Sequence, residues 1–103
     1  MQTLDVATAA AASTGVFETL ERTPVAIHIT STWGGGIVTM QQSFDKGTNW
    51  ITFSPGGVDE TFGADQTNDY EDLPGGCYWR FTNDATAAAT TVRVSSPRIN
   101  VNV

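Results

Sequence analysis

The feature that most constrains this chain is a set of short segments in which apolar and polar residues alternate. Residues 24–31, PVAIHITS, carry valine or isoleucine at every second position, and residues 77–82, CYWRFT, alternate cysteine, tryptophan and phenylalanine with more polar residues. A period of two puts one set of side chains on a single face of a β-strand. Threonine, which favours strands, is the commonest residue with 16 copies, whereas leucine has three. The sequence therefore predicts an all-β chain.

Turn residues divide the chain into about seven short strands, near residues 16–20, 24–31, 37–42, 49–53, 77–82, 90–94 and 98–103. This pattern favours a single antiparallel β-sandwich, either Ig-like or jelly-roll-like, although a barrel fits it as well. A chain of 103 residues has room for one domain, which we assign to residues 16–103. Residues 1–15 are rich in alanine and threonine, and we interpret them as an N-terminal arm whose conformation the composition leaves open.

Charge and cysteine content exclude several classes of function. Eleven acidic residues against five basic ones give a net charge of -6, so we expect no nucleic-acid partner. No apolar run reaches the ~18 residues of a membrane-spanning helix, and no signal peptide is recognisable, so we expect no membrane partner. The single cysteine, Cys77, excludes an internal disulfide and a cysteine-based zinc site. Its alternation with Trp79 and Phe81 predicts a small buried residue.

The most specific motif is the segment 43–50, SFDKGTNW. It resembles the Asp-box, S-x-D-x-G-x-T-W, of sialidase-like propellers and of isolated β-hairpins in other folds. The match covers Ser43, Asp45, Gly47 and Trp50, because threonine and asparagine stand here in the reverse of the usual order. A propeller needs several boxes and several hundred residues, so a sialidase is excluded. We predict a structural turn in which a carboxylate accepts loop N–H groups and glycine supplies a positive φ.

A wider pattern contains this box. Its members, in approximate spacing, are Trp33, Gly35, Val38, Gln41, Ser43, Asp45, Gly47 and Trp50. The pattern is similar to one found in small virion proteins of tailed bacteriophages, which carry it on an Ig-like or related β-sandwich. The resemblance spans about residues 27–81 and brings no active site with it. It implies a capsid decoration protein or, alternatively, a tail or neck component.

An acidic stretch lies between the box and the segment 77–82. Its acids are Asp59, Glu60, Asp65, Asp69, Glu71 and Asp72. The stretch is poor in aliphatic residues, so we predict a long loop over residues 58–76 with at most one short strand near residues 60–64. Its spacing does not match an EF-hand. Three interpretations stay open: a solvated loop, a patch that faces a partner, and a calcium site.

Two further groups of residues are candidate functional sites. His28 is the only histidine and lies opposite the apolar face of its strand, which predicts an exposed or interface position rather than a catalytic one. Trp33 and Tyr70 lie beside turns, where they could stack on a sugar ring, whereas Trp50 and Trp79 are expected to fill the core. We expect no catalytic residues, no cofactor and no metal centre.

The resemblance implies a non-enzymatic structural protein of the phage particle. The resemblance implies synthesis in the host cytoplasm, a place on the virion surface and binding to the major capsid protein. Few charged residues and a small core make a homo-oligomer or a lattice position more natural than a free monomer. Terminal arms could add a strand to a neighbouring subunit. The alternative is a carbohydrate-binding or host-surface-binding β-sandwich module.

Overall fold

A computed structural model describes residues 2–8, 16–31, 36–83 and 90–100. Ten strands lie in these ranges: β1 (Gln2–Thr8), β2 (Phe17–Thr19), β3 (Thr23–Ser31), β4 (Val38–Ser43), β5 (Ile51–Thr52), β6 (Thr61–Phe62), β7 (Gln66–Leu73), β8 (Cys77–Asn83), β9 (Thr90–Ser96) and β10 (Ile99–Asn100). A single 3₁₀ turn, η1 (Pro55–Gly57), follows β5, and no α-helix occurs in the described part.

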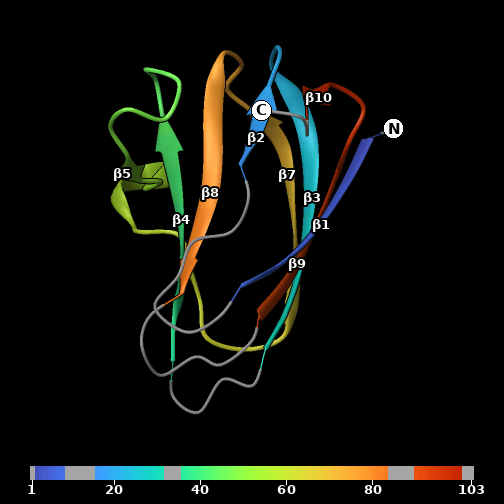
Figure 1. The fold of residues 1–103 in the computed structure, drawn as a ribbon, viewed down its shortest axis with the longest axis vertical. Helices are drawn as coiled ribbons and strands as arrows, with labels where there is room; N and C mark the ends of the chain where they lie inside the picture. Colours follow the sequence, from blue (N-terminus) through green and yellow to red (C-terminus); the bar gives the residue numbers. More distant parts are fainter. Residues whose placement is uncertain (1, 9–15, 32–35, 84–89, 101–103) are drawn as a thin grey trace.

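The strands form two antiparallel sheets that face each other (Figure 1). One sheet has the order β1-β9-β3-β7, and the other has the order β10-β2-β8-β4-β5, with β6 paired to β4. The first four strands alternate between the two sheets, as do β7, β8, β9 and β10. The predicted all-β, antiparallel sandwich is therefore confirmed.

The pairing has the pattern of one long hairpin that has been rolled up. Strand β4 pairs with β5, β3 with β7, β2 with β8 and β1 with β9, so partners lie ever further apart in the sequence. Rolling then brings β3 beside β9 and β4 beside β8. These eight strands have the connectivity of a jelly roll. It differs from an Ig-like arrangement because successive strands change sheet instead of forming hairpins within one sheet.

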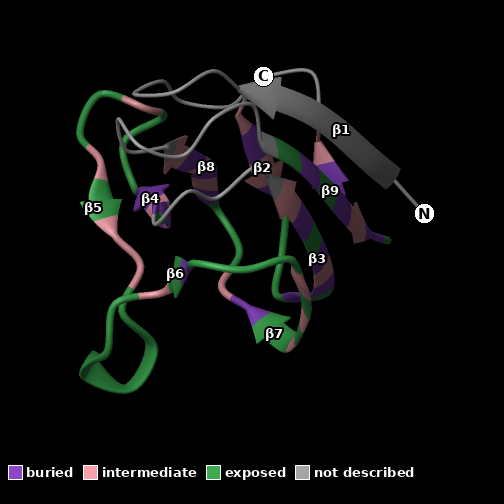
Figure 2. Ribbon diagram, turned by 90° about the horizontal axis from the view of Figure 1, so that it is seen from below, coloured by how far each residue is buried: buried purple, intermediate pink, exposed green. Residues whose placement is uncertain are grey.

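The core lies between the sheets and is lined by inward residues of β2, β3, β4, β6, β7, β8, β9 and β10 (Figure 2). Its largest fully buried side chains are Trp79, Phe17, Phe62, Phe81, Ile27, Ile29 and Met40. Cys77, Trp79 and Phe81 are all buried, as their alternation predicts. The ring of Phe17 stacks on Trp79, and the ring of Phe53 meets Trp79 edge to face at 5.0 Å between centroids.

Two segments depart from the expected strand pattern. The acidic stretch was predicted as a loop, but residues 66–73 form β7, so that prediction is wrong. It failed because β7 is an edge strand with half-buried polar residues facing inward, so no aliphatic alternation marks it. Residues 2–8, within the expected arm, pair along their whole length with β9 as β1. Strand β1 thus extends this chain's own sheet.

The turn between β7 and β8 is held against β2. The Thr19 hydroxyl donates to the Pro74 carbonyl at 2.7 Å and accepts from the indole Nε1 of Trp79 at 3.0 Å. A Cβ built on Gly75 would lie 2.5 Å from the Glu21 Cα, so only glycine fits there without a backbone shift. This contact locks the start of β8 to the end of β2.

Candidate functional site

The box segment connects β4 to β5 in a hairpin that is closed by its own side chains. The Ser43 hydroxyl is buried, donates to Asp45 Oδ1 at 2.7 Å and accepts from the N–H of Gly47 at 2.9 Å. Lys46 and Gly47 both have positive φ, +58° and +88°, which the tight turn requires. Ser43 and Asp45 therefore act on their own loop and have the geometry of a structural turn.

The Asp45 carboxylate is the acceptor around which the hairpin closes. It takes the backbone N–H of Asn49 at 2.8 Å and the Asn49 side-chain amide at 2.7 Å. These hydrogen bonds, together with that from Ser43, lower the pKa of Asp45 to about 2. Asn49 thus supplies two donors to the carboxylate, which explains how the box closes with threonine and asparagine in reversed order.

Trp50 lies on the outer face of the larger sheet and not in the core, so the expectation that it fills the core is wrong. Its ring is half-buried, and the Arg80 guanidinium lies 4.4 Å from the ring centroid. Arg80 Nε also donates to Gln41 Oε1 at 2.8 Å. Trp50 and Arg80 therefore form a cation–π stack that covers β8 and β4 from outside.

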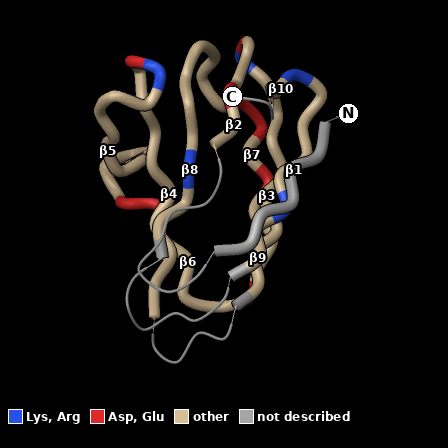
Figure 3. Tube along the Cα trace, in the orientation of Figure 1, with Lys and Arg blue, Asp and Glu red and all other residues tan. Residues whose placement is uncertain are grey.

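The structure does not bring the six acids of residues 59–72 into one site. Asp59 accepts from the Ser54 hydroxyl at 2.7 Å, and Asp72 pairs with Arg22 at 2.8 Å. Asp69 and Glu71 are exposed on β7, and Asp65 also has an interaction within the protein. Figure 3 shows how the described charges are spread over the two sheets and their loops. Among the described residues, no three His, Cys, Asp or Glu side chains form a group that could hold a metal ion.

Glu60, the remaining acid of this stretch, binds Tyr70. The Tyr70 hydroxyl donates to Glu60 Oε2 at 2.7 Å, and the ring packs edge to face on Phe53. Burial, and secondarily the neighbouring Glu60, raise the pKa of Tyr70 far above its ordinary value. Tyr70 is therefore half-buried at the edge of the core, with its hydroxyl bound to Glu60 and its ring against Phe53. Trp33, the other residue expected to face a glycan, lies outside the described residues.

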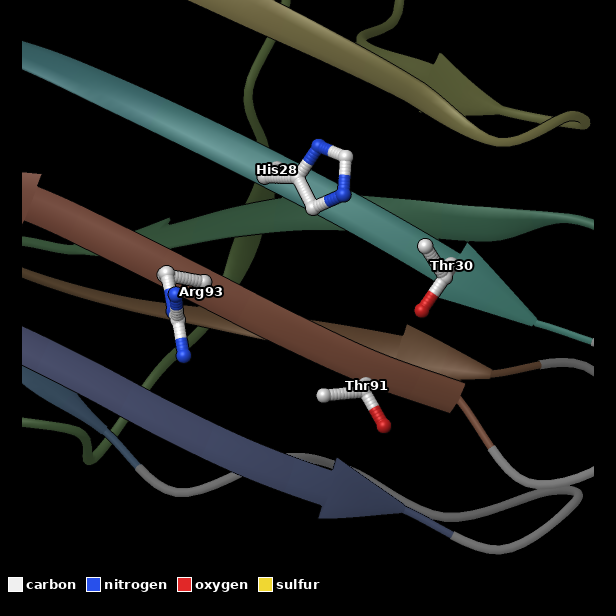
Figure 4. A pocket seen from close by; sticks show the side chains of 4 residues that line it. All are labelled: His28, Thr30, Thr91 and Arg93. Carbon is white, nitrogen blue, oxygen red and sulfur yellow. The ribbon is translucent and has the colours of Figure 1, made fainter.

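One pocket lies on the outer face of the smaller sheet, with a volume of about 430 Å³. Its lining residues are His28 and Thr30 from β3 and Thr91 and Arg93 from β9 (Figure 4). His28 is exposed, as expected, and its Nδ1 lies 2.6 Å from the Thr67 hydroxyl on β7. Sequence reasoning missed this group because alternation places Thr91 and Arg93 outward, whereas only the β3–β9 register puts them beside His28.

Cys77 carries no sign of reactive thiol chemistry. The side chain is buried, and desolvation raises the pKa of its thiol. A raised pKa reduces the thiolate fraction at neutral pH, and the thiolate is the nucleophilic form. Separately, none of the described segments forms a helix of the length and apolarity needed to cross a membrane.

The comparisons with known proteins support the fold and nothing narrower. No family model and no curated protein matches the sequence. The chain is similar to a de novo designed double-stranded β-helix, with a TM-score of 0.55, 11% identity and coverage of 93% of this chain and 99% of that one. It is also similar to the Yersinia pseudotuberculosis-derived mitogen (TM-score 0.49, 11% identity, 91% and 83% coverage) and to an oxalate oxidase (0.47, 17%, 97% and 45%). The last two scores are too low to carry an argument.

Proposed function

We propose that this chain is a non-enzymatic structural protein of a tailed-phage particle, displayed on the head as a decoration protein that binds the major capsid protein. The pattern from Trp33 to Trp50, which resembles such proteins, supports the proposal. Its members Ser43 and Asp45 hydrogen-bond to each other and to their own loop, as residues of a structural motif do. Jelly rolls also recur in viral capsids and in lectins, which is an analogy of fold only.

The observation that carries the proposal is the pair of large apolar side chains at the box hairpin. Phe44 is 66% exposed and Ile51 is 51% exposed. Ile51 pairs with Gln42 near the end of β4, and Phe44 begins the bend that follows Ser43, so both residues belong to the same hairpin. We call these two residues the hairpin apolar pair. The hydrogen-bonded turn keeps both side chains exposed to water, so neither of them contributes to the core.

The rest of the surface suits a protein that works against neighbours. Only 16% of the residues are charged, and Lys46 is the single lysine. Burying a side chain such as Phe44 on a coat subunit contributes about 1.5–3 kcal/mol. A rigid turn loses little entropy on docking, so more of this energy appears as affinity. Binding to the assembled shell but not to free subunits then stabilises the shell by mass action.

Quantitative mass spectrometry of purified particles tests the location. Hundreds of copies of this chain relative to the major capsid protein are expected for a head decoration protein, although a tail-tube subunit would give a similar number. Particles with and without the chain are then compared for thermal stability, which a tail-tube subunit leaves unchanged. A handful of copies would reassign the chain to the neck or tail, and its absence from particles would refute a virion role.

A pair of variants tests the hairpin apolar pair. Phe44→Ala, added to particles stripped of the chain, is expected to bind at least about ten-fold more weakly than the wild type. Leu20→Ala is the matched control, because Leu20 is 55% exposed but lies in the β2–β3 turn. Co-sedimentation with the particles measures occupancy. Equal loss for the two variants, or loss for neither, would contradict a docking role for this surface.

A further inference from the structure

The sheet-face pocket, lined by His28, Thr30, Thr91 and Arg93, is formed by two pairs of directly opposed residues. His28 lies opposite Arg93 and Thr30 lies opposite Thr91 in the β3–β9 pairing. Opposed residues on one face of an antiparallel pair have Cβ atoms about 4.5–5.5 Å apart. Figure 4 shows His28 and Arg93 at neighbouring positions of β3 and β9, with Thr30 and Thr91 further along the same strands; the His28 ring leans towards Thr30, and the Arg93 side chain extends towards β1. The pocket therefore has a nitrogen-rich end and a hydroxyl end.

The nitrogen-rich end is suited to a carboxylate. A guanidinium has a planar set of N–H donors that matches two carboxylate oxygens. Asp5 occupies the register position across from Arg93 on β1, and Arg93 has an interaction within the protein. A guanidinium carries five N–H donors, so it can serve a protein acceptor and a ligand together. The hydrogen bond between His28 Nδ1 and Thr67 holds the imidazole at the rim.

The hydroxyl end is suited to the alcohol groups of a sugar. The hydroxyls of Thr30 and Thr91 both donate and accept, as sugar hydroxyls do. No tryptophan, tyrosine or phenylalanine lines the pocket, so a neutral sugar would lack the broad stacking surface that these rings provide. A volume near 430 Å³ falls at the lower end of the range for small-ligand sites and is far more than one acidic side chain fills.

The negative charge around the pocket limits the number of negative charges that a ligand can carry. Asp69 and Glu71 are exposed on the neighbouring strand β7, and the net charge of the chain is -6. These negative charges repel a ligand that carries several negative charges. A ligand with one carboxylate can instead place that group within hydrogen-bonding range of the positively charged Arg93. We propose that the sheet-face pocket binds a single carboxylate-bearing sugar unit, of the uronic acid type, from a surface polysaccharide. This role is independent of the virion function.

An NMR titration of the ¹⁵N-labelled chain tests the proposal. The probe is D-glucuronate, with D-glucose as the same ring without a carboxylate and acetate as a carboxylate without a ring. Glucuronate is expected to shift the amide signals of residues 28, 30, 91 and 93 and to bind at least about ten-fold more tightly than either comparator. No shift at these residues would overturn the proposal. Acetate binding as tightly as glucuronate would refute a sugar site and leave general anion binding.

Variants separate the two ends of the pocket. Arg93→Gln is expected to weaken glucuronate binding at least about ten-fold, and Arg98→Gln is the control, because Arg98 is an exposed arginine paired with Glu21 away from the pocket. Thr91→Val keeps Arg93 and is expected to weaken binding severalfold, which keeps the proposal testable if Arg93→Gln perturbs the fold. Equal weakening by Arg98→Gln, or none by Arg93→Gln and Thr91→Val, would refute the site.

Discussion

Replacing Thr19 by valine is expected to be among the most destabilising single changes outside the apolar core. Valine keeps the shape of threonine and removes the hydroxyl, so Trp79 Nε1 loses its acceptor and the Pro74 carbonyl loses its donor. Thr19 and Trp79 are both 0% exposed, so water cannot replace these partners at the indole. An unsatisfied buried group costs about 1–3 kcal/mol, and the half-buried Pro74 carbonyl adds less than the indole, so the total loss is about 2–4 kcal/mol.

Urea unfolding followed by circular dichroism measures this loss. With a slope of about 1.5 kcal/mol per molar urea, a loss of 3 kcal/mol lowers the midpoint by about 2 M. Thr82→Val is the matched control, because the Thr82 hydroxyl is half-buried and lies 3.5 Å from its acceptor, the Thr39 carbonyl. We expect the control to change the free energy of unfolding by less than about 0.5 kcal/mol.

A double-mutant cycle identifies the cause. In a Trp79→Phe background no indole N–H remains, so Thr19→Val is expected to cost about 1–2 kcal/mol less than in the wild type. An equal cost in both backgrounds would show that the hydroxyl does not act through the indole. A Thr19→Val variant within about 0.5 kcal/mol of the wild type would refute the reasoning altogether.

Three further changes have distinct expected outcomes. The pKa of Asp45 is about 2 in the folded chain, below its unfolded value, so the stabilisation from the charged carboxylate is present above about pH 4 and is lost as pH falls towards 2. Asp45→Asn is therefore expected to flatten this part of the curve of unfolding free energy against pH, as measured by urea titrations. Tyr70→Phe removes the hydrogen bond to Glu60 and is expected to lower the free energy of unfolding by about 1 kcal/mol at pH 7. Because burial raises the pKa of Tyr70, the neutral phenol stabilises the fold below about pH 10, and this stabilisation is lost at higher pH. Above that pH the variant therefore loses less stability than the wild type. Gly75→Ala lowers the thermal midpoint, whereas Gly63→Ala, where a Cβ meets open space, leaves it nearly unchanged.

Each of these expectations has a contradicting result. Wild-type-like acid sensitivity of Asp45→Asn would show that the hairpin hydrogen bonds do not depend on the charged carboxylate. An unchanged alkaline transition in Tyr70→Phe would exclude Tyr70 as its source. Equal effects of the two glycine substitutions would show that the close approach at Gly75 is unimportant to stability.

The strand segments with strict alternation were predictable because the alternation of apolar and polar residues is a local property of the sequence. Residues 24–31 lie within β3, and residues 77–82 lie within β8, with their apolar faces inward. The box hairpin was predictable for the same reason, since Ser43, Asp45 and Gly47 interact within a few residues of one another. By contrast, β7 carries polar residues on its inner side and was missed, because its strand state depends on pairing with β3.

The sequence by itself determined the β class, the short antiparallel strands and the self-closed turn, because side-chain period and short-range hydrogen bonds decide them. Tertiary structure alone decided the jelly-roll order, the placing of Trp50 under Arg80 and the meeting of His28 with Arg93. Each of these requires a cross-strand register between segments that lie 30 or more residues apart. Alternation predicts which face of a strand a side chain occupies. Only the pairing of the strands in the rolled hairpin decides which other side chains lie beside it on that face.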